Sequence, residues 1–241
     1  ASVRVVLVGR WVAVAAPAAQ HYDLARAALE AGKHVFVEKP LALEVADAEK
    51  LCELAEARSL TLMVGHLLQY HPAFLALQKL LDGGTLGRLQ YLYSNRLNLG
   101  KFRREENILW IFSPHDISMI LSLVRAEPVS VWAVGSRYLH REIADVTTTH
   151  LAFSGGEQAH VYVSWLHPVK EQKLVVVGDR GMAVFDDGEP WSAKLRLYPH
   201  RIDWRNGHPQ PVRADAEQVV LEESEPLRNE CAHFLDCVTT G

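Results

Sequence analysis

The feature that most constrains the fold is a short apolar run that ends abruptly in charged residues, within residues 33–43 (KHVFVEKPLAL). Val35–Val37 is typical of a buried strand, and the Glu-Lys-Pro sequence that follows ends it at once. The side chain of Lys39 is therefore predicted to lie at the carboxyl end of a strand. In open α/β sheets this is the edge at which ligands bind.

The residues before this strand extend the same pattern. Residues 19–31 have the periodicity of an amphipathic helix, closed by Gly32, and residues 11–16 form another apolar run. Strand, helix and strand in this order predict a βαβ unit with a right-handed crossover. Residues 44–58 and 60–65 add a further helix and strand.

The chain changes character after about residue 70. Beyond a helix at 72–81, strand patterns dominate, with one helix predicted from Pro114 to Val124. The predicted strands cover residues 89–97, 129–138, 146–153, 159–165, 173–177, 183–186 and 194–198. Strands that follow one another without helices indicate antiparallel pairing. We therefore predict a Rossmann-type α/β domain over 1–70, and over 71–241 an α+β domain with a large, mostly antiparallel sheet.

Composition narrows the class of protein. The chain has 241 residues, 49% of them hydrophobic, and a net charge of −4, which gives no electrostatic footprint for nucleic acid. No apolar run is long enough to span a bilayer, so we expect a cytoplasmic protein with no membrane partner. Cys52, Cys231 and Cys237 lack metal-ligand spacing, so we expect buried free thiols and no metal site.

Four sequence motifs resemble those of the glucose–fructose oxidoreductase / inositol dehydrogenase / MocA family of NAD(P)-dependent dehydrogenases. Residues 15–43 resemble the family's segment from its fourth strand through the Glu-Lys-Pro motif, and residues 63–74 (MVGHLLQYHPAF) resemble the next strand and helix entry. Residues 107–121 (NILWIFSPHDISMIL) resemble the helix with the catalytic histidine, and 226–238 resemble a C-terminal helix. The four motifs occur in the same order as in the family and together span most of the chain. Their combination is therefore stronger evidence of the resemblance than any single motif.

The resemblance implies catalytic roles for Lys39 and His115. Oxidation of a secondary alcohol requires a base for the hydroxyl proton, and imidazole titrates in the range for that task. An ammonium group stabilises the developing alkoxide. We place His115 near a helix start, because Pro114 suits a first turn, and we read Asp116 as a partner of the helix dipole. The alternatives are a solvated Lys39 and a capping or core His115.

The resemblance also implies a nicotinamide cofactor, NAD in preference to NADP, at the same sheet edge. Alternatively, His21 is an exposed residue at the entry to a helix, and His66 and Tyr70 pack between the two domains. The predicted cofactor contacts are Gly9, Pro17, His21, Glu38, Lys39, Pro40 and His66. A cis peptide bond before Pro40 is a further hypothesis.

The cofactor site departs from the family at the phosphate loop. Residues 4–9 look like the first Rossmann strand and its first glycine, yet the chain continues at Trp11 into what resembles the fourth strand. The rest of G-x-G-x-x-G, the first helix and the ribose-binding acid are absent. We expect that residues between Gly9 and Val12 are missing from this sequence. Otherwise the dinucleotide half-site is gone and catalysis is doubtful.

The substrate prediction rests on a second departure. Inositol dehydrogenase-like members carry an aspartate one turn before the histidine, where this chain has Ile111. The motif instead resembles the branch that oxidises the 3-hydroxyl of UDP-N-acetylhexosamines or their uronates. Tyr70, Arg96 and Asn107 are candidate substrate contacts together with His115. Arg96 could otherwise be a charge on the sheet surface, and Asn107 a helix cap.

We therefore predict an NAD(P)-dependent oxidoreductase acting on a sugar or UDP-sugar. The alternatives are a free-sugar, inositol or dihydrodiol dehydrogenase of the same family, and a non-catalytic sugar or nucleotide sensor on the same fold. The large sheet has helices for one face only, so we also predict a homo-oligomer, a dimer or tetramer.

Overall fold

The chain divides into two compact units. The structure, a computed structural model, describes residues 4–100, 102–103, 106–139 and 141–240. The first unit runs to Tyr70 and includes the segment from Ser224 onward, and the second comprises His71–Glu223. The segment from Ser224 onward thus packs with the first unit. We predicted it in the second domain, because the order of elements along a chain does not show which layer a distant segment completes.

A four-stranded sheet with the order β1-β2-β3-β4 forms the centre of the first unit. The sheet pairs β2 with β3 and β3 with β4 in parallel, which confirms the predicted βαβ units. Its strands are β1 (Arg4–Val8), β2 (Trp11–Ala15), β3 (His34–Glu38) and β4 (Leu62–Gly65). The short helix η1 (Ala18–Gln20) and then α1 (His21–Glu30) follow β2, and α2 (Val45–Ala57) follows β3.

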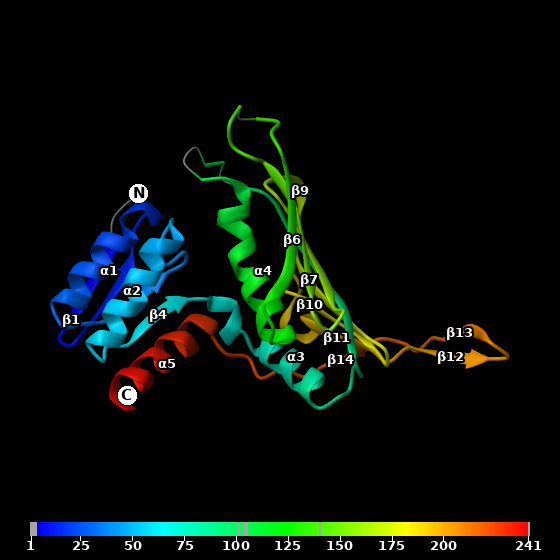
Figure 1. The fold of residues 1–241 in the computed structure, drawn as a ribbon. Helices are drawn as coiled ribbons and strands as arrows, with labels where there is room; N and C mark the ends of the chain where they lie inside the picture. Colours follow the sequence, from blue (N-terminus) through cyan, green and yellow to red (C-terminus); the bar gives the residue numbers. More distant parts are fainter. Residues whose placement is uncertain (1–3, 101, 104–105, 140, 241) are drawn as a thin grey trace. The chain divides into compact units, whose positions relative to one another are not determined.

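Helices cover both faces of this sheet. The alternate residues Val12 and Val14 of β2 pack with Leu29 of α1 and Leu51 of α2 in one apolar core. The opposite face is covered by α5 (Pro226–Thr240), which brings Phe234 edge-on to the rings of Trp11 and Phe36, at centroid distances of 6.0 and 5.7 Å. Figure 1 shows these three layers. The first unit is therefore an α/β/α sandwich that the last helix of the chain completes.

The N-terminal strand does not take the place of a first Rossmann strand. β1 runs antiparallel to β2, with Val8 opposite Trp11, so that Gly9 and Arg10 form a two-residue hairpin turn. Gly9 adopts φ +53°, a conformation that favours glycine, and its carbonyl accepts a hydrogen bond from Lys33 Nζ at 2.6 Å. In this structure Gly9 does not start a phosphate loop, because the chain continues from its turn directly into β2 and not into a helix.

The second unit contains the predicted large sheet, with the order β14-β11-β10-β9-β5-β8-β7-β6. All pairs are antiparallel except β5 with β8. Its strands are β5 (Leu89–Leu99), β6 (Pro128–Ser136), β7 (Val146–Phe153), β8 (Gln158–Ser164), β9 (Leu166–Gly178), β10 (Met182–Asp186), β11 (Leu195–Tyr198) and β14 (Glu217–Gln218). The predicted two-part fold is confirmed.

Two helices pack on one face of this sheet, α3 (Pro72–Asp82) against β10 and α4 (Ile108–Val124) against β5, β7 and β8. The predicted start of α4 at Pro114 is wrong. Asn107 is its N-cap, and Pro114 lies inside the helix, after almost two turns. Proline typically occupies a first turn, but a helix tolerates it internally where one backbone hydrogen bond is given up.

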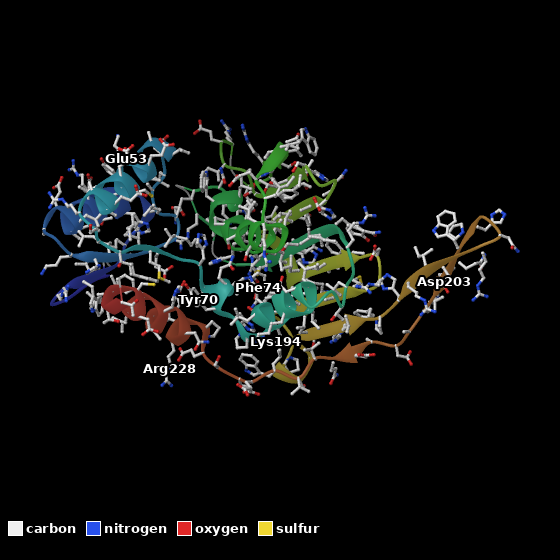
Figure 2. All side chains as sticks on the ribbon, turned by 60° about the horizontal axis from the view of Figure 1, so that its bottom comes forward. Glu53, Tyr70, Phe74, Lys194, Asp203 and Arg228 are labelled. Carbon is white, nitrogen blue, oxygen red and sulfur yellow. The ribbon has the colours of Figure 1, made fainter. Side chains whose placement is uncertain are left out.

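A two-stranded ribbon that the sequence did not predict projects from the sheet (Figure 1). It consists of β12 (Arg201–Arg205) and β13 (His208–Val212), joined by the Asn-Gly turn at 206–207. Both turn residues have positive φ, as a tight hairpin requires. Asp203, labelled in Figure 2, lies on this ribbon. The Asn-Gly pair was the available signal, but Pro209 and Pro211 weaken the strand pattern around it.

The cysteines also differ from expectation. Cys52 and Cys231 are exposed and Cys237 is partly exposed, so the prediction of buried thiols is wrong. Cys52 lies on α2, and Cys231 and Cys237 lie on α5. Among the described residues, no helix is long and apolar enough to cross a membrane.

Candidate active site

The Glu-Lys-Pro segment lies where predicted, at the carboxyl end of β3. Glu38 is the last residue of the strand and pairs with Gly65 of β4. A Cβ atom at Gly65 would meet Glu38 Oε2 at 3.2 Å and the Phe36 ring at 3.1 Å, so glycine lets the Glu38 side chain lie flat against β4. The bond between Lys39 and Pro40 is cis, which confirms that hypothesis. Lys39 itself is half-buried.

His21 holds this segment from the side. Its ring is buried, with Nδ1 2.6 Å from the carbonyl of Pro40 and Nε2 2.8 Å from the carbonyl of Ala16. The ring thus links the end of β2 to the turn that carries Lys39. The alternative of an exposed histidine is wrong. The predicted cofactor contact through the His21 ring is also not supported, because both nitrogens already face backbone carbonyls.

His66, directly after β4, lies beside Lys39 at the same edge. Burial and then the positive charge of Lys39 lower the pKa of His66, so its ring is neutral at pH 7. Pro17 starts the turn after β2, where its carbonyl accepts a hydrogen bond from the backbone N–H of Gln20 at 2.8 Å. The edge therefore gathers Glu38, Lys39, Pro40 and His66, as predicted.

A buried carboxyl group that the sequence did not single out completes this edge. Glu230 of α5 is fully buried. Burial and then the negative charge of Glu38 raise the pKa of Glu230 to about 7, and the nearby backbone of His66 opposes the shift. Because a carboxyl group with this pKa is partly protonated at neutral pH, Glu230 can hold a proton next to the residue that precedes Lys39.

Tyr70 contacts the same helix. Its hydroxyl lies 2.7 Å from His233 Nδ1, and its backbone carbonyl accepts a hydrogen bond from Asn229 Nδ2 at 3.4 Å. Burial, followed by the charges of Glu230 and Cys237, raises the pKa of Tyr70 to about 12. In this structure the hydroxyl binds α5, and its role as a substrate contact stays a prediction.

The second group of predicted residues lies on α4 and β5 of the second unit. His115 is half-buried in the middle of α4. The next residue, Asp116, points into the unit and is 1% exposed. Its carboxylate accepts two hydrogen bonds from Arg96 of β5, Nε to Oδ2 at 2.8 Å and NH2 to Oδ1 at 3.0 Å. The interpretation of Asp116 as a helix-dipole partner is therefore wrong, and Arg96 is not a charge on the sheet surface.

More charges surround this pair. The carboxylate of Asp187, directly after β10, also attracts the Arg96 guanidinium. Burial lowers the pKa of Arg96, but the negative charges of Asp116 and Asp187 outweigh this effect, so the pKa is raised. Asp187 Oδ1 accepts a hydrogen bond from Lys194 Nζ at 2.9 Å, and Figure 2 labels Lys194 in this unit. The buried guanidinium thus contacts the carboxylate of Asp116 and is attracted by a second carboxylate, that of Asp187.

Asn107 acts as a helix cap. Its Oδ1 accepts a hydrogen bond from the backbone N–H of Trp110 at 3.2 Å. We expect Asn107→Ala to lower the free energy of unfolding by about 1 kcal/mol, since a lost N-cap costs that much, and Asn107→Asp to retain it. Urea unfolding of the three proteins tests this. If Asn107→Asp retains stability but weakens sugar binding, the residue contacts substrate as well.

Comparisons with known proteins give matches in both units of the chain. Residues 9–66 match the profile of an oxidoreductase family with an NAD-binding Rossmann fold, and residues 74–184 match the GFO/IDH/MocA C-terminal domain. A solved structure from Magnetospirillum magnetotacticum MS-1 superposes with a TM-score of 0.82 at 30% identity, over 96% of this chain and 73% of that one. The chain belongs to the GFO/IDH/MocA oxidoreductase family.

Relatives within the GFO/IDH/MocA family act on different substrates. UDP-N-acetylglucosamine 3-dehydrogenase of Acidithiobacillus ferrooxidans is 33% identical over 64% of this chain and 48% of that protein. Its structure superposes with a TM-score of 0.79 at 27% identity, over 94% of this chain and 69% of that one. Inositol 2-dehydrogenase of Rhizobium meliloti is 25% identical over 95% of this chain and 70% of that protein. The chain thus spans about half the length of the first of these relatives.

Within this GFO/IDH/MocA chain, sequence reasoning missed Glu230 and misread Asp116. The signal for Glu230 was a lone carboxylate at an apolar position of an amphipathic helix, four residues before Phe234. For Asp116 the signal was its place in the series Ser113, Asp116, Ile120 and Leu123, which all face inward. Starting the helix at Pro114 instead placed Asp116 in a first turn, where a carboxylate favours the helix dipole.

Proposed function

We propose that this chain is the catalytic part of an NAD(P)-dependent oxidoreductase that oxidises a secondary hydroxyl of a sugar. The leading substrate is the 3-hydroxyl of a UDP-N-acetylhexosamine or its uronate, supported by the similarity to UDP-N-acetylglucosamine 3-dehydrogenase. The observation that carries the proposal is the position of half-buried Lys39 beside neutral His66, at the ligand-binding edge of the sheet.

The proton chemistry of this proposal belongs to two side chains. His115 accepts the proton of the substrate hydroxyl as the C–H bond of the carbinol carbon breaks. The ammonium of Lys39 stabilises the negative charge that develops on the oxygen. The nicotinamide ring of the cofactor supplies the hydride acceptor when it is bound. His21, which fixes the carbonyl of Pro40, keeps the Lys39 turn in place.

The described residues fit only part of such a cofactor. Glu38, Lys39 and His66 lie at the carboxyl ends of parallel strands, where the resemblance implies the cofactor, and Pro17 follows β2 at a position that the resemblance assigns to the adenosine side. The pyrophosphate end normally requires a glycine-rich loop and a helix N-terminus after the first strand. Here Gly9 lies in a tight hairpin turn instead. We therefore assign no residue of this chain to the cofactor phosphates.

This hairpin favours a second candidate function, a sugar or sugar-nucleotide sensor that does not turn over. Such a protein would keep the substrate domain and lose affinity for the dinucleotide. The proton-handling pair Lys39 and His115 weighs against it, because a sensor has no use for a base beside a reacting carbon.

The test is the absorbance of reduced nicotinamide at 340 nm, with NAD or NADP and a panel of UDP-sugars and free polyols. Reduction with UDP-N-acetylhexosamine or its uronate is the expected result. Reduction with inositol or free sugars alone would identify the alternative dehydrogenase. Sugar binding by calorimetry without reduction in any combination would identify the sensor.

We also propose that the chain forms a homo-oligomer through the open face of the large sheet. Among the described residues, no helix covers this face (Figure 1). A row of rings crosses four adjacent strands on it, because Trp132, His150, His160 and Tyr93 are directly paired in register. Trp132 is 57% exposed. A second copy of the chain would remove this apolar area from water.

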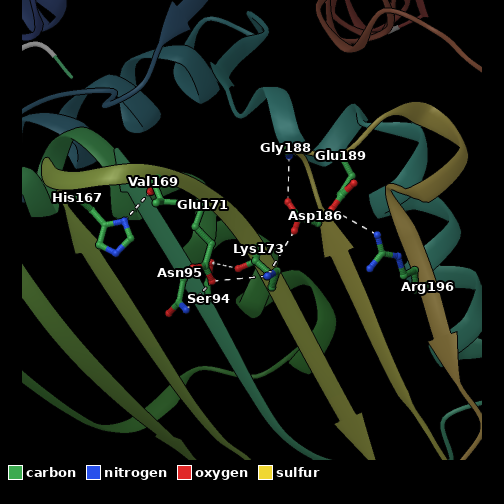
Figure 3. Close-up of polar contacts among 10 residues, drawn as sticks. All are labelled: Ser94, Asn95, His167, Val169, Glu171, Lys173, Asp186, Gly188, Glu189 and Arg196. Atoms are coloured by element: carbon green, nitrogen blue, oxygen red, sulfur yellow. Dashed lines mark hydrogen bonds and ion pairs between the residues drawn. The ribbon is translucent and has the colours of Figure 1, made fainter. Parts of the chain in front are cut away.

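Charges near the same face have neighbours of opposite sign. Lys173 Nζ lies 3.8 Å from Glu171 Oε1 and 3.4 Å from Asp186 Oδ2, and Asn95 Nδ2 also donates a hydrogen bond to Glu171 Oε1 at 2.8 Å (Figure 3). Paired charges lower the cost of desolvating the face, which is consistent with association.

We expect Trp132→Glu to shift the protein toward the 27.0 kDa monomer in light scattering, because it places a charge on the apolar face that we propose as the contact. Trp204→Ser, on the projecting ribbon, is the matched control and should keep the wild-type mass. Dissociation by the ribbon variant instead, or a monomeric wild type, would contradict assembly through the sheet face.

A further inference from the structure

Asp116, the residue after His115, is held by several hydrogen bonds. Three donors from β5 bind its carboxylate: Ser94 Oγ to Oδ1 at 2.6 Å, and the two Arg96 nitrogens at 2.8 and 3.0 Å. The Ser94 hydroxyl also lies 3.1 Å from the backbone carbonyl of Lys173 on β9. Asp116 is 1% and Arg96 8% exposed. The contact is therefore a buried connection between one point of α4 and the centre of the sheet.

This connection lies next to a weak point of the helix. Pro114 has no backbone N–H, so the hydrogen bond that residue 114 would donate to the carbonyl of Trp110 is absent. The N-terminal turns of α4 are therefore less firmly joined to its C-terminal half. His115 and Asp116 are the first residues after the interruption, and at this point Arg96 anchors the helix to the sheet.

A small rotation of the helix would displace the His115 ring. Side chains extend about 6 Å from a helix axis, so a rotation of about 10° moves a ring by about 1 Å. Displacement of a reacting group by about 1 Å can lower a rate by about 10²-fold. The two oxygens of Asp116, each bound to a different nitrogen of Arg96, fix this rotation as a single hydrogen bond would not.

Stability alone does not explain such a pair. A buried ion pair usually adds little stability over apolar residues of similar volume, although loss of one partner is costly. The chain offers a contrast in Arg125 at the end of α4, which donates two hydrogen bonds to Asp82 of α3 at 2.7 and 2.8 Å. That pair is exposed and also joins α4 to a neighbour, but it lies far along the helix from His115.

We propose that Asp116 and Arg96 are positioning residues that set the orientation of His115, and that Arg96 does not contact the sugar. The inference rests on the proposed function and replaces the substrate contact predicted for Arg96. A positioning pair should affect kcat, whereas a substrate ligand should affect KM.

The experiment compares Asp116→Asn, the apolar double variant Arg96→Met/Asp116→Leu, and Asp82→Asn as control. Turnover with UDP-N-acetylglucosamine is measured together with NMR of ¹³C-labelled histidine, in which His115→Gln identifies the His115 signal. In Asp116→Asn we expect kcat to fall about 10²-fold, KM to stay within about threefold, and the His115 signal and its titration midpoint to shift. Asp82→Asn should leave all of these unchanged.

The double variant separates positioning from folding. We expect it to unfold at or above the wild-type urea concentration while kcat stays low and the His115 signal stays displaced. Recovery of both kcat and the His115 signal would show that the pair only stabilises the unit, and a raised KM with normal kcat would make Arg96 a substrate ligand. If the wild type does not turn over, the proposed function fails, and an unmoved His115 signal in Asp116→Asn would by itself overturn the positioning role.

Discussion

Replacing Lys39 or His115 by alanine is expected to lower kcat by about 10²–10⁴-fold while cofactor binding changes little. The removal of a general base typically costs this much, and the loss of a charge that stabilises an alkoxide has a similar effect. Neither substitution removes a core side chain, since both residues are half-buried. Steady-state kinetics with the sugar nucleotide, together with NAD titration by fluorescence, measures the two effects separately.

The pH dependence distinguishes the two roles. If His115 is the base, His115→Gln should lose the acidic limb of the kcat profile, while Lys39→Arg should keep the charge and retain more turnover than Lys39→Ala. Half-buried His167 on β9 offers a matched histidine control, because His167→Gln should leave the kinetics unchanged. Near-normal turnover in both alanine variants would remove this mechanism.

The parts of the fold that could be predicted were those in which the local residue pattern matches the burial of the element in the folded protein. The run Val35–Val37, followed by Glu-Lys-Pro, specified a strand and its ligand edge, and the structure places Lys39 there beside His66. The alternating strands of the large sheet were equally readable, because a half-buried strand leaves an alternation of period two.

The failures arise where the local signal was ambiguous. Pro114 is typical of a helix start, and only packing against the sheet reveals that α4 begins at Ile108. The ion pair of Asp116 with Arg96 joins residues 20 positions apart, and no spacing rule predicts such a contact. Likewise Glu230 and Phe234 belong to the first unit, although the whole second unit separates them in sequence from the N-terminal part of the first.

Glu230 should make the stability of the protein fall as the pH rises. The pKa of its carboxyl is about 7 in the folded protein and 4.5 in an unperturbed chain, so between these values the folded state binds more protons than the unfolded state. The stabilisation is complete below about pH 4.5 and is lost as the pH rises through about 7. At about 1.4 kcal/mol for each pH unit, the total loss is about 3 kcal/mol.

Glu230→Gln should abolish this loss, because glutamine has a similar shape and does not ionise. We expect the variant to gain about 2.5 kcal/mol in free energy of unfolding relative to wild type between pH 5 and pH 8, measured by urea denaturation. Taking the difference between the two proteins cancels other groups such as His66, whose lowered pKa acts in the opposite direction. Glu53→Gln, at the exposed residue of α2 labelled in Figure 2, should stay within about 0.5 kcal/mol of wild type at every pH. Parallel pH profiles for wild type and Glu230→Gln would show that Glu230 is ionised at neutral pH, and that no proton is held between it and Glu38.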